Sequence, residues 1–258
     1  MTVSASPGPS FIAIDNLSKE YPNRHRVIHD LSFTAAAGEF VSVVGASGCG
    51  KSTLLKLIAG LSPVSGGSIR IDGMSPTDAR ALMSFVFQDP TLLPWRNVAR
   101  NVELTLELEG VGAAERLARS ASALHLVGLR DVGSHYPRQL SGGMKMRVSL
   151  ARALATTPRL LLMDEPFGAL DEITRNRLNE ELVALRQTRQ WTTLFVTHSI
   201  PEAVFLSDRI LLMGANPGRV DREISIPLPV PRTPRLRSDL QFLTLVGEVS
   251  RALASLES

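Results

Sequence analysis

The stretch Gly45-Ala-Ser-Gly-Cys-Gly-Lys51-Ser52 is the most informative part of this sequence. It matches the spacing G-x-x-x-x-G-K-[ST] and follows an apolar, β-branched run at 40–44 that predicts a buried strand. Residues 51–59 then have the character of a helix. Glycines let the backbone wrap around a phosphate with its N–H groups pointing inward, and the helix N-terminus favours the same anion. A chance glycine-rich turn is the alternative, and the flanking strand and helix argue against it.

This loop is expected to hold the phosphates of ATP. Lys51 would bring a mobile positive charge to the β- and γ-phosphates, and Ser52 would offer its hydroxyl to Mg²⁺. The residues expected to contact the nucleotide here are Gly45, Ala46, Ser47, Gly48, Cys49, Gly50, Lys51, Ser52 and Thr53.

A second apolar run, Leu160-Leu-Leu-Met-Asp164-Glu165, ends in two carboxylates. Buried acids are costly, so two of them at the end of a buried strand indicate a chemical role rather than plain structure. We expect Asp164 to hold Mg²⁺ through a water molecule and Glu165 to orient and polarise the attacking water. An exposed strand end with an acidic cap is the alternative interpretation, and the nearby phosphate loop disfavours it.

Strand-like and helix-like segments alternate around these motifs, which predicts an α/β fold with a largely parallel sheet and helices on both faces. Strands are expected at 11–14, 27–34, 40–44, 68–71, 84–87, 160–164, 193–197, 209–213 and, as an edge strand, at 220–226. Helices are expected at 51–59, 97–109, 113–126, 172–189 and 201–206. Residues from about 91 to 157 are mostly helical and indicate an inserted subdomain.

Leu140-Ser141-Gly142-Gly143 stands at the start of a helical segment, where small residues form an anion site or a simple helix cap. With this tetrapeptide the chain resembles an ATP-binding cassette (ABC) ATPase, because Leu-Ser-Gly-Gly is the signature of that family. The resemblance covers about residues 11–226. It implies a P-loop NTPase fold with a RecA-like mixed-sheet core, an antiparallel β subdomain and the inserted helical subdomain. It also implies that Ser141, Gly142 and Gly143 close on the γ-phosphate bound by a second copy of the chain.

The same resemblance assigns four further positions. Gln88 matches the glutamine that contacts Mg²⁺ and senses the transporter, and His198 matches the histidine that bonds the γ-phosphate. Asp171, at the end of Gly168-Ala-Leu-Asp171, matches a loop that communicates across the dimer. Tyr21 matches the aromatic residue that stacks on adenine.

Several segments further resemble the nitrate, sulfonate and taurine importer branch of this family: Gly38-Glu-Phe40, Gln88-Asp-Pro-Thr-Leu-Leu-Pro-Trp95, 140–147 and Asn216-Pro-Gly-Arg219. Two positions depart from the common pattern. Met144 stands where the signature commonly has Gln, and Met146 precedes Arg147 where many members have Gln. Neither position bears on the phosphate chemistry.

The ends of the chain differ from the cassette in composition. Residues 1–10 are rich in Ser and Pro, lack the pattern of a signal peptide and are expected to be a disordered leader. Prolines recur at 227–234 and predict a linker. Apolar residues then recur at intervals of three and four from Leu236 to Leu256, which predicts one amphipathic helix docked on the domain or on a partner. The cassette is therefore expected at 11–226 and the linker and helix at 227–258.

Composition narrows the class of protein. The 258 residues are 44% hydrophobic, enough for a sizeable core, and carry a net charge of +3. Lys and Arg are scattered among Asp and Glu, which favours a solvated mixed surface over nucleic-acid binding. The single cysteine, Cys49, fits a reducing compartment, and we interpret it as a small loop residue rather than a redox switch. No apolar run is long enough to span a membrane, so another chain would have to hold this one there.

The sequence therefore predicts the ATP-hydrolysing subunit of an importer, with ATP and Mg²⁺ bound. Its expected partners are a second copy in a head-to-tail dimer, two transmembrane permease subunits and, indirectly, an extracytoplasmic solute-binding protein, with no nucleic acid. We expect it at the cytoplasmic face of the inner membrane. The alternatives are a soluble ABC ATPase of DNA repair, translation or cofactor assembly, a phosphotransferase, and a non-hydrolysing binder. The cargo stays open among nitrate, taurine, an alkyl sulfonate and a pyrimidine-like vitamin precursor.

Overall fold

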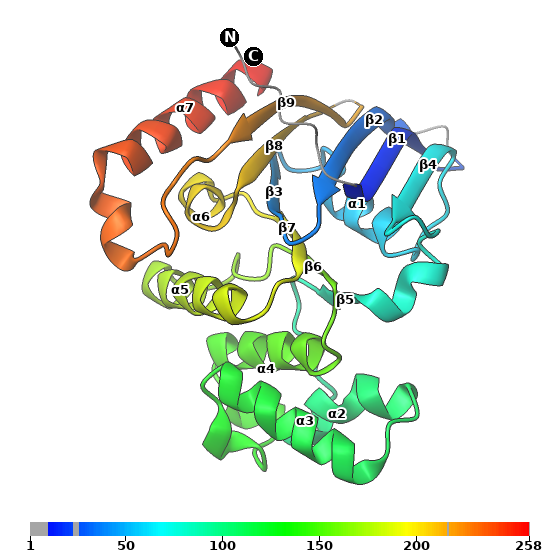
Figure 1. Ribbon diagram of the computed structural model, residues 1–258, viewed down its shortest axis with the longest axis vertical. Helices are drawn as coiled ribbons and strands as arrows, with labels where there is room; N and C mark the ends of the chain where they lie inside the picture. The colour runs from blue at the N-terminus through cyan, green and yellow to red at the C-terminus, as the bar shows by residue number, and fades with distance from the viewer. Residues whose placement is uncertain (1–9, 23–25, 216, 258) are drawn as a thin grey trace.

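A six-stranded sheet forms the centre of the molecule, with the strand order β5-β6-β7-β3-β8-β9 (Figure 1). The computed structural model describes residues 10–22, 26–215 and 217–257. The strands of this sheet are β3 (Phe40–Gly45), β5 (Met83–Val86), β6 (Leu160–Asp164), β7 (Thr192–Val196), β8 (Arg209–Gly214) and β9 (Arg219–Ser225). All neighbouring pairs are parallel except β8 and β9, which pair antiparallel at one edge. The α/β class and the edge strand expected near 220–226 are thus confirmed.

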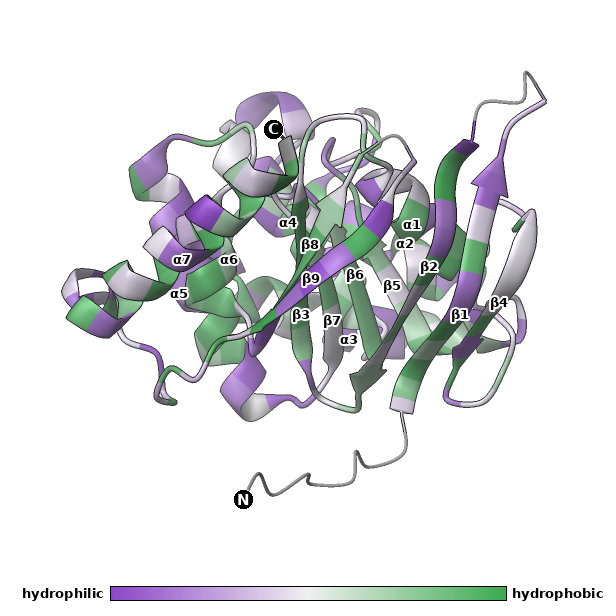
Figure 2. Ribbon diagram, turned by 90° about the horizontal axis from the view of Figure 1, so that it is seen from above, coloured by the Kyte–Doolittle hydropathy of each residue, from purple (hydrophilic) through white to green (hydrophobic). Residues whose placement is uncertain are grey.

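The central strands are buried on both faces and divide two hydrophobic cores. In β3, Phe40 and Val44 belong to one core, whereas Val41 and Val43 belong to the other. Strands β3, β6 and β7 are buried along their whole length. Strands covered on both faces are apolar or β-branched throughout rather than alternating, which is why the sequence shows them as unbroken runs. Figure 2 shows these strands coloured as hydrophobic between the outer layers.

Helices cover the face of the sheet on which Phe40 lies. They are α5 (Glu172–Thr188), α6 (Ile200–Leu206) and α7 (Leu240–Glu257). Each presents an apolar stripe to this core, and Leu182, Val204 and Val249 are fully buried there. The helical periodicity of the sequence therefore corresponds to real packing faces.

The opposite face carries one helix, α1 (Lys51–Ile58), and a second, antiparallel sheet in the order β2-β1-β4. These strands are β1 (Ser10–Glu20), β2 (Arg26–Ala36) and β4 (Gly66–Ile71). Helices therefore lie on both faces of the central sheet, as expected, and the second sheet is the antiparallel β subdomain that the resemblance implied. The predicted strand at 11–14 was too short: the register shifts near Asn16, whose φ is 48°, and this irregularity interrupts the alternation of side chains while the strand continues.

Three helices follow β5 and form a separate group at the lower end of the molecule (Figure 1). They are α2 (Val98–Leu108), α3 (Ala113–Leu126) and α4 (Gly142–Ala155), joined by the short 3₁₀ helices Arg130–Val132 and Pro137–Gln139. The buried Asn101 of α2 accepts a hydrogen bond from the Leu93 backbone N–H at 2.7 Å and donates to the Arg96 carbonyl at 2.9 Å. This side chain fixes the segment that leads from the sheet into the helical group.

Both ends of the chain depart from expectation in detail. Leu236 lies in a 3₁₀ helix, Pro234–Ser238, rather than in the C-terminal helix, which begins at Leu240. Asp239 separates the two because its carboxylate accepts the Gln241 backbone N–H at 2.8 Å, as a helix-capping residue does. Ser10, counted in the expected leader, begins β1 opposite Ala36. The rest of that leader, residues 1–9, lies outside the described residues. In the part of the chain that the structure describes, no helix is long and apolar enough to cross a membrane.

Replacement of Leu182 by Ala tests the core beneath α5. Leu182 is fully buried, so the change should lower the free energy of unfolding by about 2–5 kcal/mol. Leu117→Ala is the matched control, since Leu117 is 62% exposed and its loss should cost less than about 0.5 kcal/mol. Urea denaturation of both variants gives the comparison. Equal effects would contradict the assignment of this core.

Candidate nucleotide-binding site

Four of the predicted site segments lie at one edge of the central sheet. Gly45 ends β3, Asp164 ends β6, Thr197 follows β7 and Gln88 lies two residues after β5. These four strands are adjacent in the order β5-β6-β7-β3 and run parallel. Parallel strands bring their carboxyl ends to one edge, where α/β proteins bind ligands. The topology therefore gathers residues that lie more than 150 positions apart in the sequence.

The loop between β3 and α1 has the geometry of an anion cradle. Gly48 and Gly50 take φ values of 80° and 102°, which L side chains rarely adopt. A Cβ at Gly45 would approach the Met213 carbonyl oxygen at 2.3 Å, so this position has no room for a side chain. Gly50 begins α1 without a side-chain cap, which leaves the first N–H groups of the helix for a ligand.

The Lys51 side chain hydrogen-bonds to the backbone of this loop. This side chain is only 6% exposed, and Nζ donates to the carbonyl oxygens of Gly45 and Ala46, both at 2.8 Å. The ammonium is therefore held at the loop itself, where a polyphosphate would pass. Ala46 and Thr53 are half-buried and Ser47 and Gly48 are exposed, so the loop is partly open to a ligand.

Ser52 and Asp164 are joined directly. Ser52 Oγ donates to Asp164 Oδ1 at 2.8 Å, and Asp164 is 8% exposed. Burial raises the pKa of the Asp164 carboxyl, while the Ser52 hydrogen bond opposes that shift. A hydroxyl and a desolvated carboxylate are hard oxygen donors of the kind Mg²⁺ takes, and Mg²⁺ usually binds few protein groups besides phosphates and water. The pair therefore fits the predicted metal.

Glu165 and His198 face each other across the neighbouring strand ends. His198 Nδ1 lies 3.2 Å from Glu165 Oε2, and the histidine side chain is 55% exposed. Glu165 takes a φ of 44°, and its backbone N–H donates to the Val196 carbonyl at 2.9 Å. A Cβ at Gly168 would lie 3.4 Å from His198 Cε1. A small residue at 168 thus leaves room beside this acid–histidine pair.

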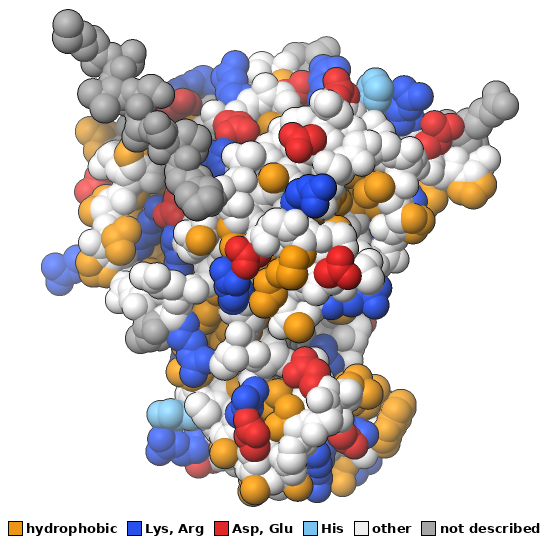
Figure 3. Space-filling view, turned by 45° about the vertical axis from the view of Figure 1, so that its right-hand side comes forward, with side chains coloured by type: hydrophobic (Ala, Val, Ile, Leu, Met, Phe, Trp, Pro, Cys, Tyr) orange, Lys and Arg blue, Asp and Glu red, His pale blue; other side chains and the backbone are white. Residues whose placement is uncertain are grey.

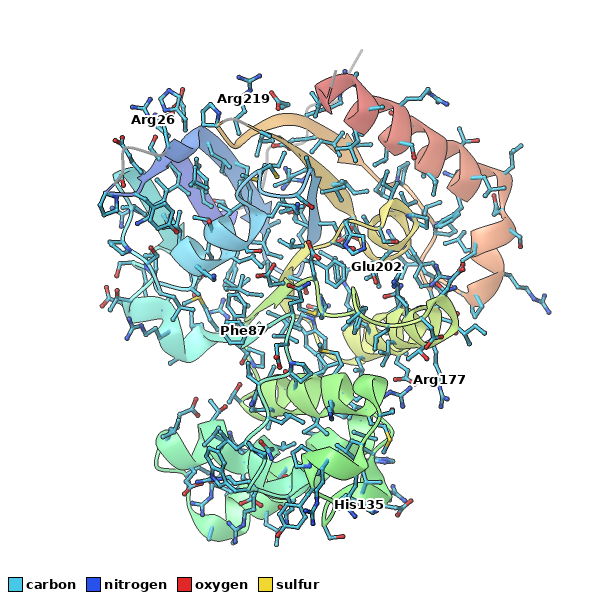
Figure 4. The ribbon with its side chains drawn as sticks, turned by 180° about the vertical axis from the view of Figure 1, so that it is seen from behind. Arg26, Phe87, His135, Arg177, Glu202 and Arg219 are labelled. Atoms are coloured by element: carbon cyan, nitrogen blue, oxygen red, sulfur yellow. The ribbon has the colours of Figure 1, made fainter. Side chains whose placement is uncertain are left out.

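Gln88 is exposed on the loop that leaves β5, and Phe87 before it lies where the main body meets the helical group (Figure 4). Arg152 of α4 holds the next part of this loop. Its guanidinium donates to the Pro90 carbonyl at 2.9 Å and to the Thr91 carbonyl at 3.1 Å. The loop of Gln88 is therefore tied to the helical group by a residue that the sequence analysis did not single out. Only a view of the folded chain reveals it, since Arg152 lies among ordinary helical residues.

Ser141, Gly142 and Gly143 begin α4, and Asp171 begins α5. Ser141 Oγ accepts the Met144 backbone N–H at 3.3 Å, and Asp171 Oδ1 accepts the Thr174 backbone N–H at 2.9 Å. That second bond lowers the pKa of the Asp171 carboxyl. A Cβ at Gly143 would lie 2.9 Å from Thr174, so these two helix starts pack closely together. Among the described residues, no hydrogen bond joins the Ser141 side chain to the loop at 45–52 of the same chain.

Tyr21 lies at the end of β1 and is 40% exposed, with the Lys19 ammonium 5.0 Å from its ring centre. The β-hairpin that carries it also reaches the phosphate loop, because a Cβ at Gly50 would lie 3.2 Å from Val27 and Ile28. The Tyr21 ring is thus partly exposed on the strand pair whose other strand contacts the loop. The stacking role stays a prediction.

Thr197 and Glu202 support the histidine and were also missed by sequence reasoning. Thr197 Oγ1 donates to Glu202 Oε2 at 2.5 Å and accepts the Ser199 backbone N–H at 3.0 Å. Glu202 is 4% exposed, and burial raises the pKa of its carboxyl. The two residues fix the backbone on both sides of His198. A Thr and a Glu five positions apart give no recognisable pattern in the sequence.

The site combines a strand–glycine loop–helix unit, an acidic pair at the end of a second strand of the same sheet and a histidine after the strand between them. This combination defines the class of P-loop ATPases. The sequence profile of the ABC transporter family matches residues 28–168. The chain belongs to that family and is accordingly an ATP-binding cassette ATPase, with the P-loop NTPase fold that the sequence predicted.

Three relatives illustrate the range of similarity. The chain is 43% identical to the nitrate import ATP-binding protein NrtD of Synechocystis sp., over 90% of this chain and 89% of that protein. It is 47% identical to the taurine import ATP-binding protein TauB of Rhizobium johnstonii, over 81% of each. It is 41% identical to the aliphatic sulfonates import ATP-binding protein SsuB of Bacillus cereus, over 86% of this chain and 88% of that protein.

A solved structure supports the same conclusion. It is a dimeric ATP-binding cassette in a post-hydrolysis state with ADP and Pi bound, and it superposes with a TM-score of 0.75 at 32% identity. The superposition covers 84% of this chain and 100% of that one.

Alkylation tests the interpretation of Cys49. The thiol is 1% exposed, and burial raises its pKa, so it should react with iodoacetamide at pH 7.5 more slowly than free glutathione. Unfolding in urea should restore the rate of a free thiol. Labelling of the folded chain as fast as that of glutathione would instead support a reactive, redox-sensitive Cys49. Mass spectrometry of the intact chain measures the rate.

Proposed function

We propose that this chain is the ATP-hydrolysing subunit of an importer for small solutes of the nitrate, sulfonate or taurine kind. Two copies bind two ATP molecules at a shared face, and their closure drives two transmembrane permease subunits. A solute-binding protein delivers the cargo on the other side of the membrane, so this chain works at the cytoplasmic face of the inner membrane. The proposal is supported by the family and by the import names of relatives at 41–47% identity.

The arrangement of Ser52, Asp164, Glu165 and His198 is the single observation that carries this function. The Ser52–Asp164 bond and the Glu165–His198 contact lie at the ends of adjacent strands. Phosphoryl transfer needs positioning and electrostatic stabilisation more than covalent chemistry. One edge of a rigid sheet supplies both.

Each residue then has a role in hydrolysis. Lys51 binds the β- and γ-phosphates, and Ser52 and Asp164 would hold Mg²⁺. When bound, Mg²⁺ neutralises charge on these phosphate oxygens. Glu165 orients and polarises the attacking water. His198, whose Nδ1 lies 3.2 Å from Glu165 Oε2, donates a hydrogen bond to the γ-phosphate. Gln88 lies at the outer end of the same edge and reports the occupied site to the helical group.

The signature completes the site from a second copy. Ser141 and Gly142 are exposed at the N-terminus of α4, a position that favours an anion. Asp171 lies beside them at the start of α5 and would contact the partner copy. In a two-fold dimer each signature would reach the other copy's phosphate loop, so that ATP is bound between the two. The dimeric state of the solved cassette supports this arrangement.

The loop of Gln88 is proposed to contact the permease. Trp95, on the segment that leads from this loop to α2, is 71% exposed. Large exposed aromatic residues are favoured anchors in protein interfaces. Positive and negative groups are interspersed over the face shown in Figure 3 with no large patch of one sign, which fits a protein partner better than nucleic acid. Purification of the chain with its complex, followed by binding assays on the extracytoplasmic receptor, would identify the cargo.

Replacement of Glu165 by Gln tests the catalytic assignment. The variant keeps the size of the side chain but loses the carboxylate that polarises water, so kcat should fall by about 10²–10⁴-fold while ATP still binds. With MgATP, the stalled protein should double its mass in light scattering. Glu248→Gln is the control, since Glu248 is exposed on α7. A Glu165→Gln chain that stays monomeric with ATP bound would contradict a dimer that binds ATP between its two copies.

Mixed dimers test whether the site is shared between copies. Lys51→Met disables the phosphate loop, and Ser141→Arg blocks the signature, so each variant alone should be inactive. In a mixed dimer both defects fall into one site and the other site is intact. A 1:1 mixture should therefore recover about a quarter of the wild-type rate, because half of the dimers carry one good site of two.

The mixing experiment distinguishes a shared site from one formed within a single chain. If phosphate loop and signature of the same chain met, every site in every dimer would carry one defect. No activity would then return at any mixing ratio. The measurement is phosphate release from MgATP across a series of ratios, with each variant mixed with wild-type protein as the control for exchange of subunits.

A further inference from the structure

The C-terminal segment binds the end of helix α6. Arg232, which follows the cassette in the proline-rich stretch, is 6% exposed. Its guanidinium donates to the carbonyl oxygens of Phe205 at 2.8 Å and Ser207 at 2.6 Å, and more weakly to Val204 at 3.4 Å. The last carbonyls of a helix have no partner within the helix, so a cation here satisfies them and interacts favourably with the helix dipole.

Arg237 and α7 add further contacts to the same helix. The guanidinium carbon of Arg237 lies 3.8 Å from the centre of the Phe205 ring, within the range of a cation–π interaction. Phe242, Leu245 and Val249 of α7 are buried in the core that contains Val204 and Phe205. The segment from 232 to 257 therefore holds α6 from its outer side. Burial in this place is costly for a cation: it lowers the pKa of Arg232 to about 10.

The other end of α6 carries the candidate catalytic histidine. His198 lies two residues before the helix, whose N-cap is Ser199. Glu202, in the first turn, accepts a hydrogen bond from the Thr197 hydroxyl, and the same hydroxyl accepts a hydrogen bond from the Ser199 backbone N–H. Figure 4 shows Glu202 inside the main body, away from the outer surface. The helix and the residues before it thus form one hydrogen-bonded unit.

Helix α6 has only seven residues, about 10 Å of axial length. A displacement of its C-terminal end should therefore also displace His198, because the hydrogen bonds of Thr197 to Glu202 and Ser199 hold the residues around His198 to the start of the helix. His198 must stay within hydrogen-bond reach of Glu165 and the γ-phosphate. A shift of about 1 Å in such a group can cost about 10²-fold in rate.

We propose that Arg232 and Arg237 are positioning residues for hydrolysis: through α6 they fix His198 against Glu165. The proposal rests on the role given to His198 above and extends it to a segment outside the cassette core. The C-terminal segment is then part of the catalytic apparatus rather than a cover for apolar surface.

Four substitutions in the full-length chain test this. Arg232→Gln removes the donors to the Phe205 and Ser207 carbonyls. Arg232→Lys keeps a charge and part of the hydrogen bonding. Arg237→Gln removes the cation over the Phe205 ring but leaves the Arg232 hydrogen bonds to the carbonyls at the helix end. Arg235→Gln is the matched control, because Arg235 is an exposed arginine in the 3₁₀ helix that also contains Arg237.

The proposal predicts a split between catalysis and binding. Arg232→Gln should lower kcat for MgATP by about tenfold or more while the Kd for MgATP changes less than about twofold. Arg232→Lys should recover a part of the loss, Arg237→Gln should show a smaller loss, and Arg235→Gln none. The NMR signal of His198 Cε1–H, assigned by its absence in His198→Gln, should shift in the impaired variants and not in the control.

A purely structural role gives another outcome. In that case Arg232→Gln and Arg237→Gln would melt at a lower temperature. Well below that temperature they would retain the wild-type kcat and an unshifted His198 signal, which would overturn the proposal. If Arg232→Gln does not fold, Arg237→Gln decides by the same readouts. Failure of the proposed function is distinct, since Glu165→Gln would then leave ATP turnover unchanged.

Discussion

The hydrogen bond from Ser52 Oγ to Asp164 Oδ1 is the interaction on which the site depends. It joins residues 112 positions apart and connects the phosphate loop to the acidic strand end. The bond is possible because β3 and β6 lie in one parallel sheet, separated only by β7, and end at the same edge. Lys51 precedes Ser52 and Glu165 follows Asp164, and the charges of both act on the Asp164 carboxyl, while His198 contacts Glu165.

Burial explains why polar chemistry is confined to that edge. The central strands separate two apolar cores, so within the sheet the charged groups of the site lie where the strands end. Asp164 is still largely desolvated there, and its raised pKa records the cost. A desolvated carboxylate beside a hydroxyl interacts more strongly with a cation than the same group in water would. The site therefore draws its electrostatic strength from the same burial that stabilises the fold.

Two arginines link this edge to the rest of the molecule in different directions. Arg152 ties the loop after Gln88 to α4, the helix that begins with Ser141. Arg232 ties the C-terminal segment to α6, the helix that follows His198. Both donate to backbone carbonyls, so they constrain the course of the chain rather than a single side chain. The helical group and the C-terminal segment are therefore each joined by direct hydrogen bonds to segments next to the nucleotide edge.

The sequence by itself determined the class of fold, the phosphate loop, the acidic strand end and the positions of nearly all helices and strands. These are local patterns: Gly48 and Gly50 reflect backbone angles, and the apolar runs reflect burial on both faces. Only the tertiary structure decided that β1 continues past Asn16, that Asp239 begins the last helix anew, and that Thr197, Glu202, Arg152 and Arg232 support the site. The physical reason is that these contacts join residues whose spacing in sequence has no period. Their partners are backbone carbonyls and buried oxygens that become neighbours only when the sheet has formed.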